Sequence, residues 1–330
     1  MKKYHVYGIG NALVDMEYRV SDEFLTENEI GKGLMTLVEA DRQHELLQKL
    51  SGEQAERACG GSAANTIIAV SQYGGNSFYS CKVANDETGD FYYQDLVANH
   101  VDTNIREGRK EGNTGKCLVM VTEDAERTMN TFLGITSTFS EEELNEDALR
   151  LSDYLYIEGY LVASETGRAA AVKAHEMANK HGVKTALTLS DPSMVEFFKD
   201  GLMEMLGDGV DLLFCNEAEA KQWCGAEDLE VVKEEMKKYA KTFAITLGSK
   251  GAVVYDGDNF LDIESFPVDA VDSNGAGDMF AGAFLYGITH GMDYYQAGRL
   301  ASLGAGTVVS HFGPRITKDK CQELKTRIEG

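Results

Sequence analysis

The sequence predicts an α/β fold built on a mostly parallel sheet. Short apolar segments alternate with longer helix-like segments along most of the chain, and this alternation is typical of repeated βαβ units. The 330 residues are 43% hydrophobic and 26% charged, which is the balance of a globular protein. Only 3 prolines occur, and no Pro-rich linker, low-complexity run or internal repeat divides the chain. We therefore expect one domain over residues 1–330.

Short apolar runs give the expected strands. In order they are Tyr4–Gly8, Phe78–Val83, Lys116–Thr122, Tyr154–Ile157, Val183–Leu189, Asp211–Cys215, Phe243–Leu247 and Ala252–Tyr255. The helices expected between most of them include Ser62–Tyr73, Gly89–Asn99, Thr166–His181, Ser193–Leu206, Leu229–Lys241 and Gly275–Thr289. Parallel sheets bind ligands beyond the carboxyl ends of their strands, so we expect functional residues in the loops that follow the strands.

Two regions, about 16–39 and 107–133, interrupt the alternation. The first is polar and irregular. The second holds two strand-like pieces, Cys117–Val121 and Thr128–Phe132, around a turn. We expect the two regions to form a small β sheet that projects from the main domain and covers it as a lid.

Charge and cysteine usage exclude several classes of function. The formal net charge of −23 argues against nucleic acid as a partner, because phosphate backbones require a basic surface. The 6 cysteines have no CxxC spacing, which indicates reduced thiols in a cytoplasmic protein without disulfides or a zinc site. No secretory signal and no apolar run of membrane-spanning length is present, so we expect no membrane association.

The most informative motif is Asp272-Ser273-Asn274-Gly275-Ala276-Gly277-Asp278, directly before an apolar helix-like run. Backbone N–H groups at such a helix start form a pocket for anions. A carboxylate inside an anion pocket suits phosphoryl transfer, in which Asp278 accepts a proton from the attacking hydroxyl. The alternative is a tight turn with Asp278 as an ordinary first-turn charge.

Two further motifs offer polar groups for a small molecule. The cluster Gly60-Gly61-Ser62-Ala63-Ala64-Asn65 allows close approach to the backbone, and Asn65 both donates and accepts hydrogen bonds. Asn11 and Asp15 follow the first strand, and a carboxylate there can accept two hydrogen bonds from a vicinal diol. The alternatives are a buried helix start capped by Ser62 and an Asx turn at the strand end.

Two motifs later in the chain indicate a metal and a nucleotide. Asn216 and Glu219 place two oxygen-bearing side chains on one face of a helix's first turn, where they can hold the water shell of Mg²⁺. The alternative is an N-terminal capping box. The glycines of Thr246-Leu247-Gly248-Ser249-Lys250-Gly251 either admit a nucleotide or form a hairpin turn.

Other phosphate and nucleotide motifs are missing from the sequence. Neither a GxxxxGK[ST] loop nor the catalytic loop of protein kinases occurs. Gly8-Ile9-Gly10 begins like a dinucleotide fingerprint, but Leu13 stands at the third glycine position.

Taken together and in this order, the motifs resemble those of the ribokinase family, also called the PfkB carbohydrate kinase family. The resemblance covers essentially the whole chain. It implies a three-layer α/β/α sandwich with a small β lid, and transfer of the γ-phosphoryl group of ATP to a hydroxymethyl group with the help of Mg²⁺. It also implies a catalytic base at Asp278 and an anion hole at Gly275, Ala276 and Gly277.

The remaining roles implied by the resemblance concern binding. Substrate contacts correspond to Asn11, Asp15, Gly61, Ser62 and Asn65. Nucleotide contacts correspond to Asn216, Thr246, Gly248 and Gly251, and magnesium is organised by Asn216 and Glu219. Asp272 matches a position that several members place at a monovalent cation, so K⁺ is a candidate cofactor.

The acceptor is less determined than the reaction. The segments Gly10–Asp15 and Gly60–Ser62 resemble adenosine kinases more than ribokinases, which usually carry lysine in place of Ser62. The apolar start of Gly33–Leu47 also resembles the adenosine kinase lid, and an apolar lid suits a flat base. Tyr160 can stack on that base or be a surface aromatic, and Arg127 can steer a substrate or be a solvated turn residue.

We therefore expect a kinase that phosphorylates the 5′-hydroxymethyl group of a nucleoside, adenosine first. A sugar kinase of the same family, acting on ribose, fructose or a relative, is the alternative. A non-catalytic nucleotide or sugar sensor is a second alternative, against which the intact Asp278, Asn216 and Glu219 argue. Both a monomer and a homodimer paired through the lids fit the family, and the adenosine kinase-like lid favours the monomer.

Overall fold

A computed structural model describes residues 2–52, 56–124 and 126–329. Nine strands form its large sheet. In spatial order they are β14 (Phe260–Ile263), β13 (Ala252–Tyr255), β12 (Ala240–Thr246), β11 (Val210–Asn216), β10 (Lys184–Thr188), β9 (Ser152–Glu158), β1 (Tyr4–Ile9), β5 (Ser77–Ser80) and β6 (Val101–Thr103). All neighbours from β12 to β6 pair in parallel, and β13 and β14 are antiparallel. The expected α/β fold with a mostly parallel sheet is confirmed.

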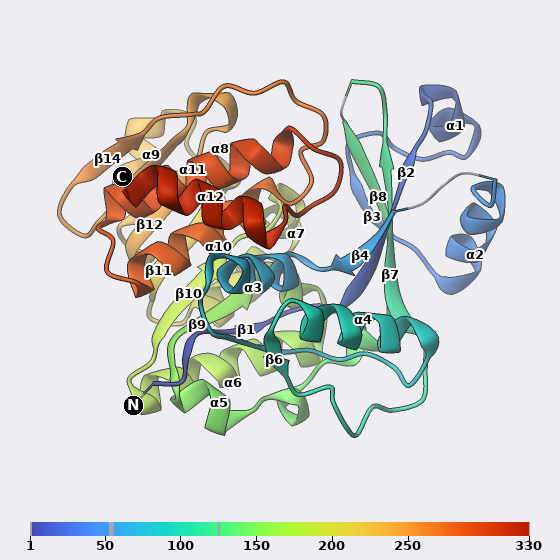
Figure 1. Cartoon of the computed structure of the whole chain (residues 1–330), viewed down its shortest axis with the longest axis horizontal. Helices are drawn as coiled ribbons and strands as arrows, with labels where there is room; N and C mark the ends of the chain where they lie inside the picture. The colour runs from blue at the N-terminus through green and yellow to red at the C-terminus, as the bar shows by residue number, and fades with distance from the viewer. Residues whose placement is uncertain (1, 53–55, 125, 330) are drawn as a thin grey trace.

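Helices cover both faces of this sheet (Figure 1). They are α3 (Ser62–Tyr73), α4 (Glu87–Ala98), α5 (Glu146–Arg150), α6 (Glu165–His181), α7 (Pro192–Leu206), α8 (Glu217–Cys224), α9 (Leu229–Met236), α10 (Ala276–Thr289), α11 (Tyr294–Val309) and α12 (Lys318–Glu329). Alternate residues of a strand enter different cores. On β11, Leu212 and Phe214 pack with α3 and α10, whereas Leu213 and Cys215 pack with α6 and α7. This alternation gives the three layers.

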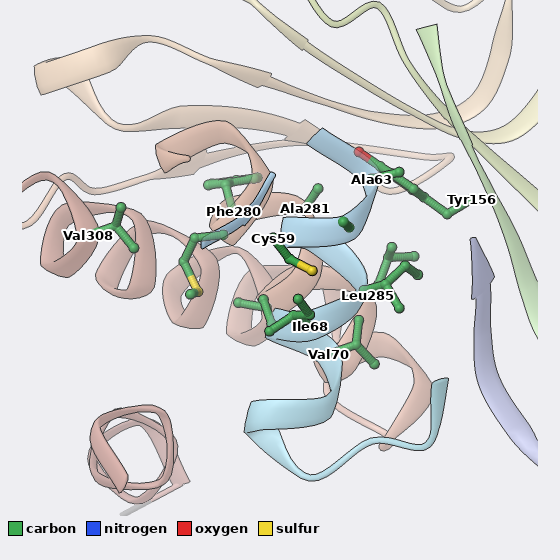
Figure 2. Packing of buried hydrophobic residues seen from close by; sticks show 14 of the residues in the cluster. Cys59, Ala63, Ile68, Val70, Tyr156, Phe280, Ala281, Leu285 and Val308 are labelled. Carbon is green, nitrogen blue, oxygen red and sulfur yellow. The ribbon is translucent and has the colours of Figure 1, made fainter. Parts of the chain in front are cut away.

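Helices α3 and α10 pack closely in the core of one face (Figure 2). A β-carbon at Gly282 of α10 would lie 2.6 Å from both the Ala69 side chain and the Thr66 carbonyl of α3, so only glycine permits this approach. Ile68 and Leu285 belong to the same buried cluster. The packing brings the first turns of the two helices together, although 212 residues separate Thr66 from Asp278.

A second sheet stands beside the first, on the right of Figure 1. Its five strands, in spatial order, are β3 (Met35–Leu37), β8 (Arg127–Gly134), β7 (Thr114–Val121), β2 (Leu13–Arg19) and β4 (Glu56–Gly60). The helices α1 (Asp22–Glu27) and α2 (Ala40–Lys49) accompany it. The small sheet therefore includes β4 and the start of β2, which lie outside the expected ranges 16–39 and 107–133.

The start of the region expected to be irregular is a strand with two different faces. Val14, Met16 and Tyr18 of β2 are buried with apolar residues of the same core as α2. The intervening Asp15 and Glu17 are also buried, at 6% and 2% exposure. Because acidic residues are rare in strands, their alternation with apolar ones concealed β2.

Other boundaries differ by a few residues from those expected. The helix expected to continue to Lys241 ends at Met236, because a turn leads directly into β12 at Ala240. Among the described residues no helix is both long and apolar enough to cross a lipid bilayer. The cysteines are free thiols, as expected, and all but Cys224 are buried.

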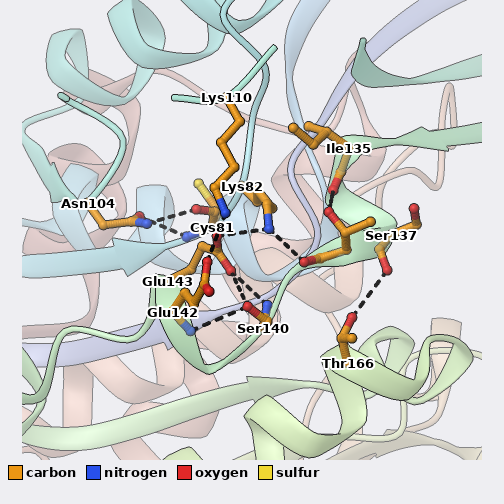
Figure 3. A network of polar contacts seen from close by, with 11 residues as sticks. Cys81, Lys82, Asn104, Lys110, Ile135, Ser137, Ser140, Glu142, Glu143 and Thr166 are labelled. Atoms are coloured by element: carbon orange, nitrogen blue, oxygen red, sulfur yellow. Dashed lines mark hydrogen bonds and ion pairs between the residues drawn. The ribbon is translucent and has the colours of Figure 1, made fainter. Parts of the chain in front are cut away.

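A polar network ties the end of β5 to the segment that precedes α5 (Figure 3). Lys82 Nζ lies 2.9 Å from Glu143 Oε1 and donates to the Thr138 carbonyl at 2.7 Å. The two side chains of the pair are only 10% and 11% exposed. In the neighbouring pair, Lys110 and Glu142, the side chains are 59% and 72% exposed.

We expect Lys82→Ala to lower the free energy of unfolding by about 3 kcal/mol, because it leaves the Glu143 carboxylate nearly buried without its cation. Lys110→Ala is the matched control, and its exposed pair should contribute less than about 1 kcal/mol. Urea denaturation followed by circular dichroism measures both. Equal effects of the two substitutions would contradict the structural role given to Lys82.

Candidate active site

A cavity of about 270 Å³ lies between the carboxyl ends of the large sheet and one face of the small sheet. Its position agrees with the rule that α/β sheets bind ligands beyond the carboxyl ends of their strands. Most of the residues selected from the sequence line it, namely Asn11, Asp15, Gly61, Ser62, Asn65, Arg127, Tyr160, Asn216, Glu219, Thr246, Gly275, Gly277 and Asp278. Ala276, Gly248, Gly251 and Asp272 are not among the lining residues.

Helix α10 begins at the cavity with the sequence Gly275-Ala276-Gly277. Gly275 is the N-cap residue with φ of 73°, and a side chain there would collide with the backbone of Pro314. Gly277 has open space where a β-carbon would stand. The first N–H groups of the helix therefore border free volume, which is the arrangement of an anion site.

Asp278 lies in the first turn of α10 and is held by two side chains of α3. Ser62 Oγ donates to Asp278 Oδ1 at 2.6 Å, and Asn65 Nδ2 donates to Asp278 Oδ2 at 3.0 Å. Desolvation raises the pKa of Asp278 above its usual value, while these hydrogen bonds and the charge of Arg127 oppose the rise. The proposed cap at Ser62 is wrong, because Gly61 is the N-cap of α3 and the Ser62 hydroxyl serves Asp278.

Glu158, at the end of β9, was missed as a site residue. Its carboxylate accepts from Asn11 N–H at 3.2 Å, Asn11 Nδ2 at 3.1 Å and Ala63 N–H at 2.8 Å. Desolvation raises its pKa to about 7 against these donors. The group thus fixes Asn11 beside the start of α3. Its place at the carboxyl end of a predicted parallel strand was the signal that could have identified it.

Asp15 projects from β2 into the same cavity. Desolvation and the neighbouring carboxylate of Glu17 raise its pKa to about 8, while Arg315 and Arg127 act in the opposite direction. The side chain lies directly over Gly60, where a β-carbon would collide with it. A carboxyl group that is buried but faces a cavity is suited to ligand hydroxyls that hydrogen-bond to it.

Arg127, the first residue of β8, reaches the loop before α10. Its Nη1 donates to Asn274 Oδ1 at 2.7 Å, and Asn274 Nδ2 donates to Glu17 Oε1 at 2.7 Å. Arg127 is therefore a cavity residue with a specific partner and not a solvated turn residue. Asp272 is fully buried, and its carboxylate accepts from the N–H groups of Asn274 and Gly313 at 2.9 and 3.0 Å.

Asn216 and Glu219 form the capping box that was the alternative to a metal site. Asn216 Oδ1 accepts from Glu219 N–H at 2.8 Å, and Glu219 Oε2 accepts from Asn216 N–H at 3.1 Å. Both residues nevertheless line the cavity, and desolvation raises the pKa of Glu219 to about 7. Among the described residues no group of three or more His, Cys, Asp or Glu is arranged to hold a metal ion alone.

The loop from Thr246 to Gly251 joins the antiparallel strands β12 and β13. It therefore forms the hairpin turn that was one of the two interpretations of its sequence. Thr246 lines the cavity, and Gly248 has open space around the position of a β-carbon. Gly251, in contrast, lies against the backbone of β14 and its neighbours, so packing explains this glycine.

The small sheet contributes an apolar wall to the cavity. The wall residues are Leu13, Met35, Leu37, Cys117, Met129 and Leu133, and the main domain adds the apolar lining residues Met194, Phe214 and Phe280. Tyr160 also lines the cavity, and its hydroxyl lies 3.5 Å from Asp191 Oδ2. It is therefore not an ordinary surface aromatic. The cavity lining thus combines apolar side chains with carboxylates and amides, and on the small sheet Asp15 of β2 pairs with the wall residue Cys117 of β7.

Comparison with known proteins agrees with this geometry. The structure of adenosine kinase from Sinorhizobium meliloti superposes with a TM-score of 0.91 and is 36% identical, covering 98% of this chain and 99% of that one. A probable sugar kinase from Rhizobium etli CFN 42 gives a TM-score of 0.93 at 33% identity, covering 100% and 99%. Ribokinase of Staphylococcus aureus (strain COL) is 28% identical over 74% of this chain and 80% of its own length.

The family model for pfkB family carbohydrate kinases matches residues 30–321, most of the chain. The matched region contains Asp278 and the glycines before it, and each of the two solved structures is covered to 99% by the superposition. The chain belongs to the pfkB family of carbohydrate kinases and is a kinase.

Proposed function

We propose that this kinase transfers the γ-phosphoryl group of ATP to the 5′-hydroxymethyl group of a nucleoside, adenosine first. The observation that carries the proposal is the composition of one cavity. Asp278 and the open helix start of α10 lie in the same cavity as an apolar wall from the small sheet. Asp278 and the helix start suit phosphoryl transfer, and the apolar wall suits the planar base of a nucleoside.

Asp278 acts as the base in this scheme. Its carboxylate accepts the proton of the acceptor hydroxyl while the hydroxyl oxygen bonds to the γ-phosphorus and the bond to the ADP oxygen breaks. Ser62 and Asn65 hold the two carboxylate oxygens from α3, which fixes the direction of the base. The N–H groups at the start of α10 stabilise negative charge on the transferring group.

The residues that surround the cavity fit Mg·ATP. Mg²⁺ keeps several waters and is usually held by one or two carboxylates together with substrate phosphates, so no larger cluster of acidic ligands is needed. Glu219 and Asn216 would hold it through water, and the ion would neutralise charge on the phosphates. Thr246 and the open side of Gly248 would contact the nucleotide. The K⁺ site at Asp272 stays a prediction.

The acceptor is inferred from the wall and from Asp15. The wall residues of the small sheet, Met129 and Leu133 among them, can pack on a base, and Tyr160 can stack on it. Asp15 can accept hydrogen bonds from a ribose diol. The likeness to the adenosine kinase at 36% identity supports this choice. In this proposal the small sheet is the lid over the bound substrates.

A sugar kinase is the second candidate. The structure of the probable sugar kinase has the higher TM-score, 0.93. Asn11, Asp15 and Asn65 would contact a free sugar as well as a ribosyl group. In either case we propose an acceptor without a phosphate group. Several carboxyl groups line the cavity but Arg127 is the one basic residue among its described lining residues, so a second anionic group would be repelled. The cytoplasmic location and the monomeric state remain predictions from the sequence.

We expect Asp278→Asn to lower kcat by about 10²- to 10⁴-fold, because the amide cannot accept the hydroxyl proton. ADP production from Mg·ATP with adenosine measures the loss. Asp208→Asn, at an exposed loop position, is the matched control and should keep wild-type activity. Turnover by Asp278→Asn close to that of the control would refute the base role.

We expect Met129→Glu to raise KM for adenosine by roughly 10- to 100-fold, because it places a carboxylate in the apolar wall. KM for ribose or fructose, which lack a base, should change much less. Leu34→Glu provides the control, since Leu34 is 61% exposed and is not one of the wall residues. The acceptor panel comprises adenosine, inosine, guanosine, cytidine, ribose and fructose. Turnover with free sugars alone would establish the second candidate instead.

We expect Asp15→Asn to change how stability depends on pH. The folded-state pKa of Asp15, about 8, lies above its unfolded value near 3.8. The stability from the protonated carboxyl is therefore complete below pH 4 and is lost as the pH rises through 8. Between pH 5.5 and 7.5 the wild type should lose up to about 2.5 kcal/mol more than Asp15→Asn in urea denaturation. Identical slopes for the two proteins would contradict the raised pKa.

A further inference from the structure

Asn274 occupies the position directly before the N-cap of α10 and is only 6% exposed. Its side chain uses both ends of the amide. The Oδ1 atom accepts from Arg127 Nη1 at 2.7 Å, and the Nδ2 group donates to Glu17 Oε1 at 2.7 Å. Arg127 and Glu17 belong to the small sheet, whereas Asn274 belongs to the catalytic motif of the main domain.

The two partners of Asn274 stand on different strands. Arg127 lies on β8 and Glu17 on β2, and β7 runs between them. The register pairs Glu17 with Val119 and Arg127 with Val121, so the two residues flank β7 two positions apart. The amide of Asn274 therefore spans the central strand of the small sheet and contacts the sheet at two points.

The backbone around Asn274 is also fixed. Its N–H donates to Asp272 Oδ1 at 2.9 Å, and the other oxygen of Asp272 accepts from Gly313 N–H at 3.0 Å. Pro314, next to Gly313, lies against Gly275. The amide thus projects from a braced loop, and a shift of the small sheet would have to break its hydrogen bonds or move the helix start.

We propose that Asn274 is a positioning residue that holds the Arg127 guanidinium at the cavity and couples the small sheet to the start of α10. The inference rests on the proposed role of Asp278 and α10 in phosphoryl transfer. Asparagine suits this position because one side chain must accept from a cation and donate to a carboxylate. Aspartate could not donate to Glu17, and serine is too short to contact both partners.

The charge of Arg127 gives the coupling a chemical consequence. It lowers the pKa values of Asp15 and Asp278, which desolvation raises. The ionisable groups that surround these carboxyls, the two themselves included, are Asp15, Glu17, Cys117, Arg127, Tyr156, Glu158, Tyr160, Asp191, Glu219, Asp278 and Arg315. If Arg127 moved away from the cavity, the pKa values of these carboxyl groups would rise. Asp278 would then be protonated, and unable to act as a base, at a higher pH than in the wild type.

The test is the pH profile of kcat/KM for Asn274→Ala with Mg·ATP and adenosine, or with whichever acceptor the panel identifies. We expect kcat/KM at pH 7 to fall by about 10- to 100-fold, because a hydrogen bond to a charged group is lost. The acidic limb of the profile should move to higher pH, so that the loss is smaller at pH 9. A merely structural defect would lower the whole profile without moving its limb.

A double-mutant cycle gives the second readout. If Asn274 acts through Arg127, the double variant Asn274→Ala/Arg127→Ala should be no slower than Arg127→Ala alone. Additive losses would overturn the proposal, and so would an unchanged pH profile for Asn274→Ala. Glu17→Gln keeps an oxygen that can accept from Asn274 Nδ2, so it should lower kcat/KM less than Asn274→Ala does.

Controls separate this inference from the proposed function. Asn179→Ala, at an exposed position of α6, should match the wild type. If thermal melting shows that Asn274→Ala is unfolded, Asn274→Ser takes its place, because serine keeps a polar side chain at this buried position but is too short to contact both partners. A wild-type profile in a folded Asn274 variant, together with inactive Asp278→Asn, would reject the positioning role alone. An active Asp278→Asn would instead reject the proposed role of Asp278 as the base.

Discussion

The rest of the structure depends on one constraint, the burial of several carboxyl groups between the large and the small sheet. We call this region the seam. Asp15, Glu17, Glu158 and Glu219 are each less than a tenth exposed, and Asp278 lies beside them. Burial of unpaired carboxylates is costly, so each needs donors or a proton. Most of the donors are neutral, namely backbone N–H groups, amides and a hydroxyl. The arrangement keeps the cavity acidic without filling it with cations, which suits an acceptor that carries no phosphate.

The helix packing of the main domain serves this seam. The contact of α3 with α10 at Gly282 places Ser62 and Asn65 against Asp278 from one side. The loop between 272 and 275 places Asn274 against the small sheet on the other side. Asp278 therefore takes its orientation from a rigid helix pair, while the neighbouring charge of Arg127 depends on where the small sheet lies. The main domain thus sets the geometry of the proposed base, and the small sheet influences its ionisation.

The seam also links function with stability. A carboxyl group whose pKa is raised in the folded state makes folding less favourable at neutral pH than a neutral group of the same shape. Asp15, Glu158 and Glu219 all have raised pKa values, at about 8, 7 and 7. Such residues are poor choices for stability alone, and they are concentrated where substrates would supply hydroxyl groups or a metal ion. Such a concentration is typical of an active site, because a bound ligand can supply the hydrogen bonds or the positive charge that the protein does not give these carboxyl groups.

The sequence by itself determined the mostly parallel α/β sheet and placed helix starts at Ser62 and Gly275, and it offered the hairpin after Thr246 as one of two interpretations. These features are local, because they follow from apolar runs, glycine turns and helix lengths within a few tens of residues. It did not determine β2 or β4, whose polar residues hide the strand pattern, nor the role of Glu158. Contacts such as Ser62 with Asp278 and Asn274 with Glu17 join positions 216 and 257 residues apart. Only the strand order and the packing of α3 on α10 decide which of these side chains meet, because hydrogen bonds over such separations depend on the whole chain's path and not on any local sequence.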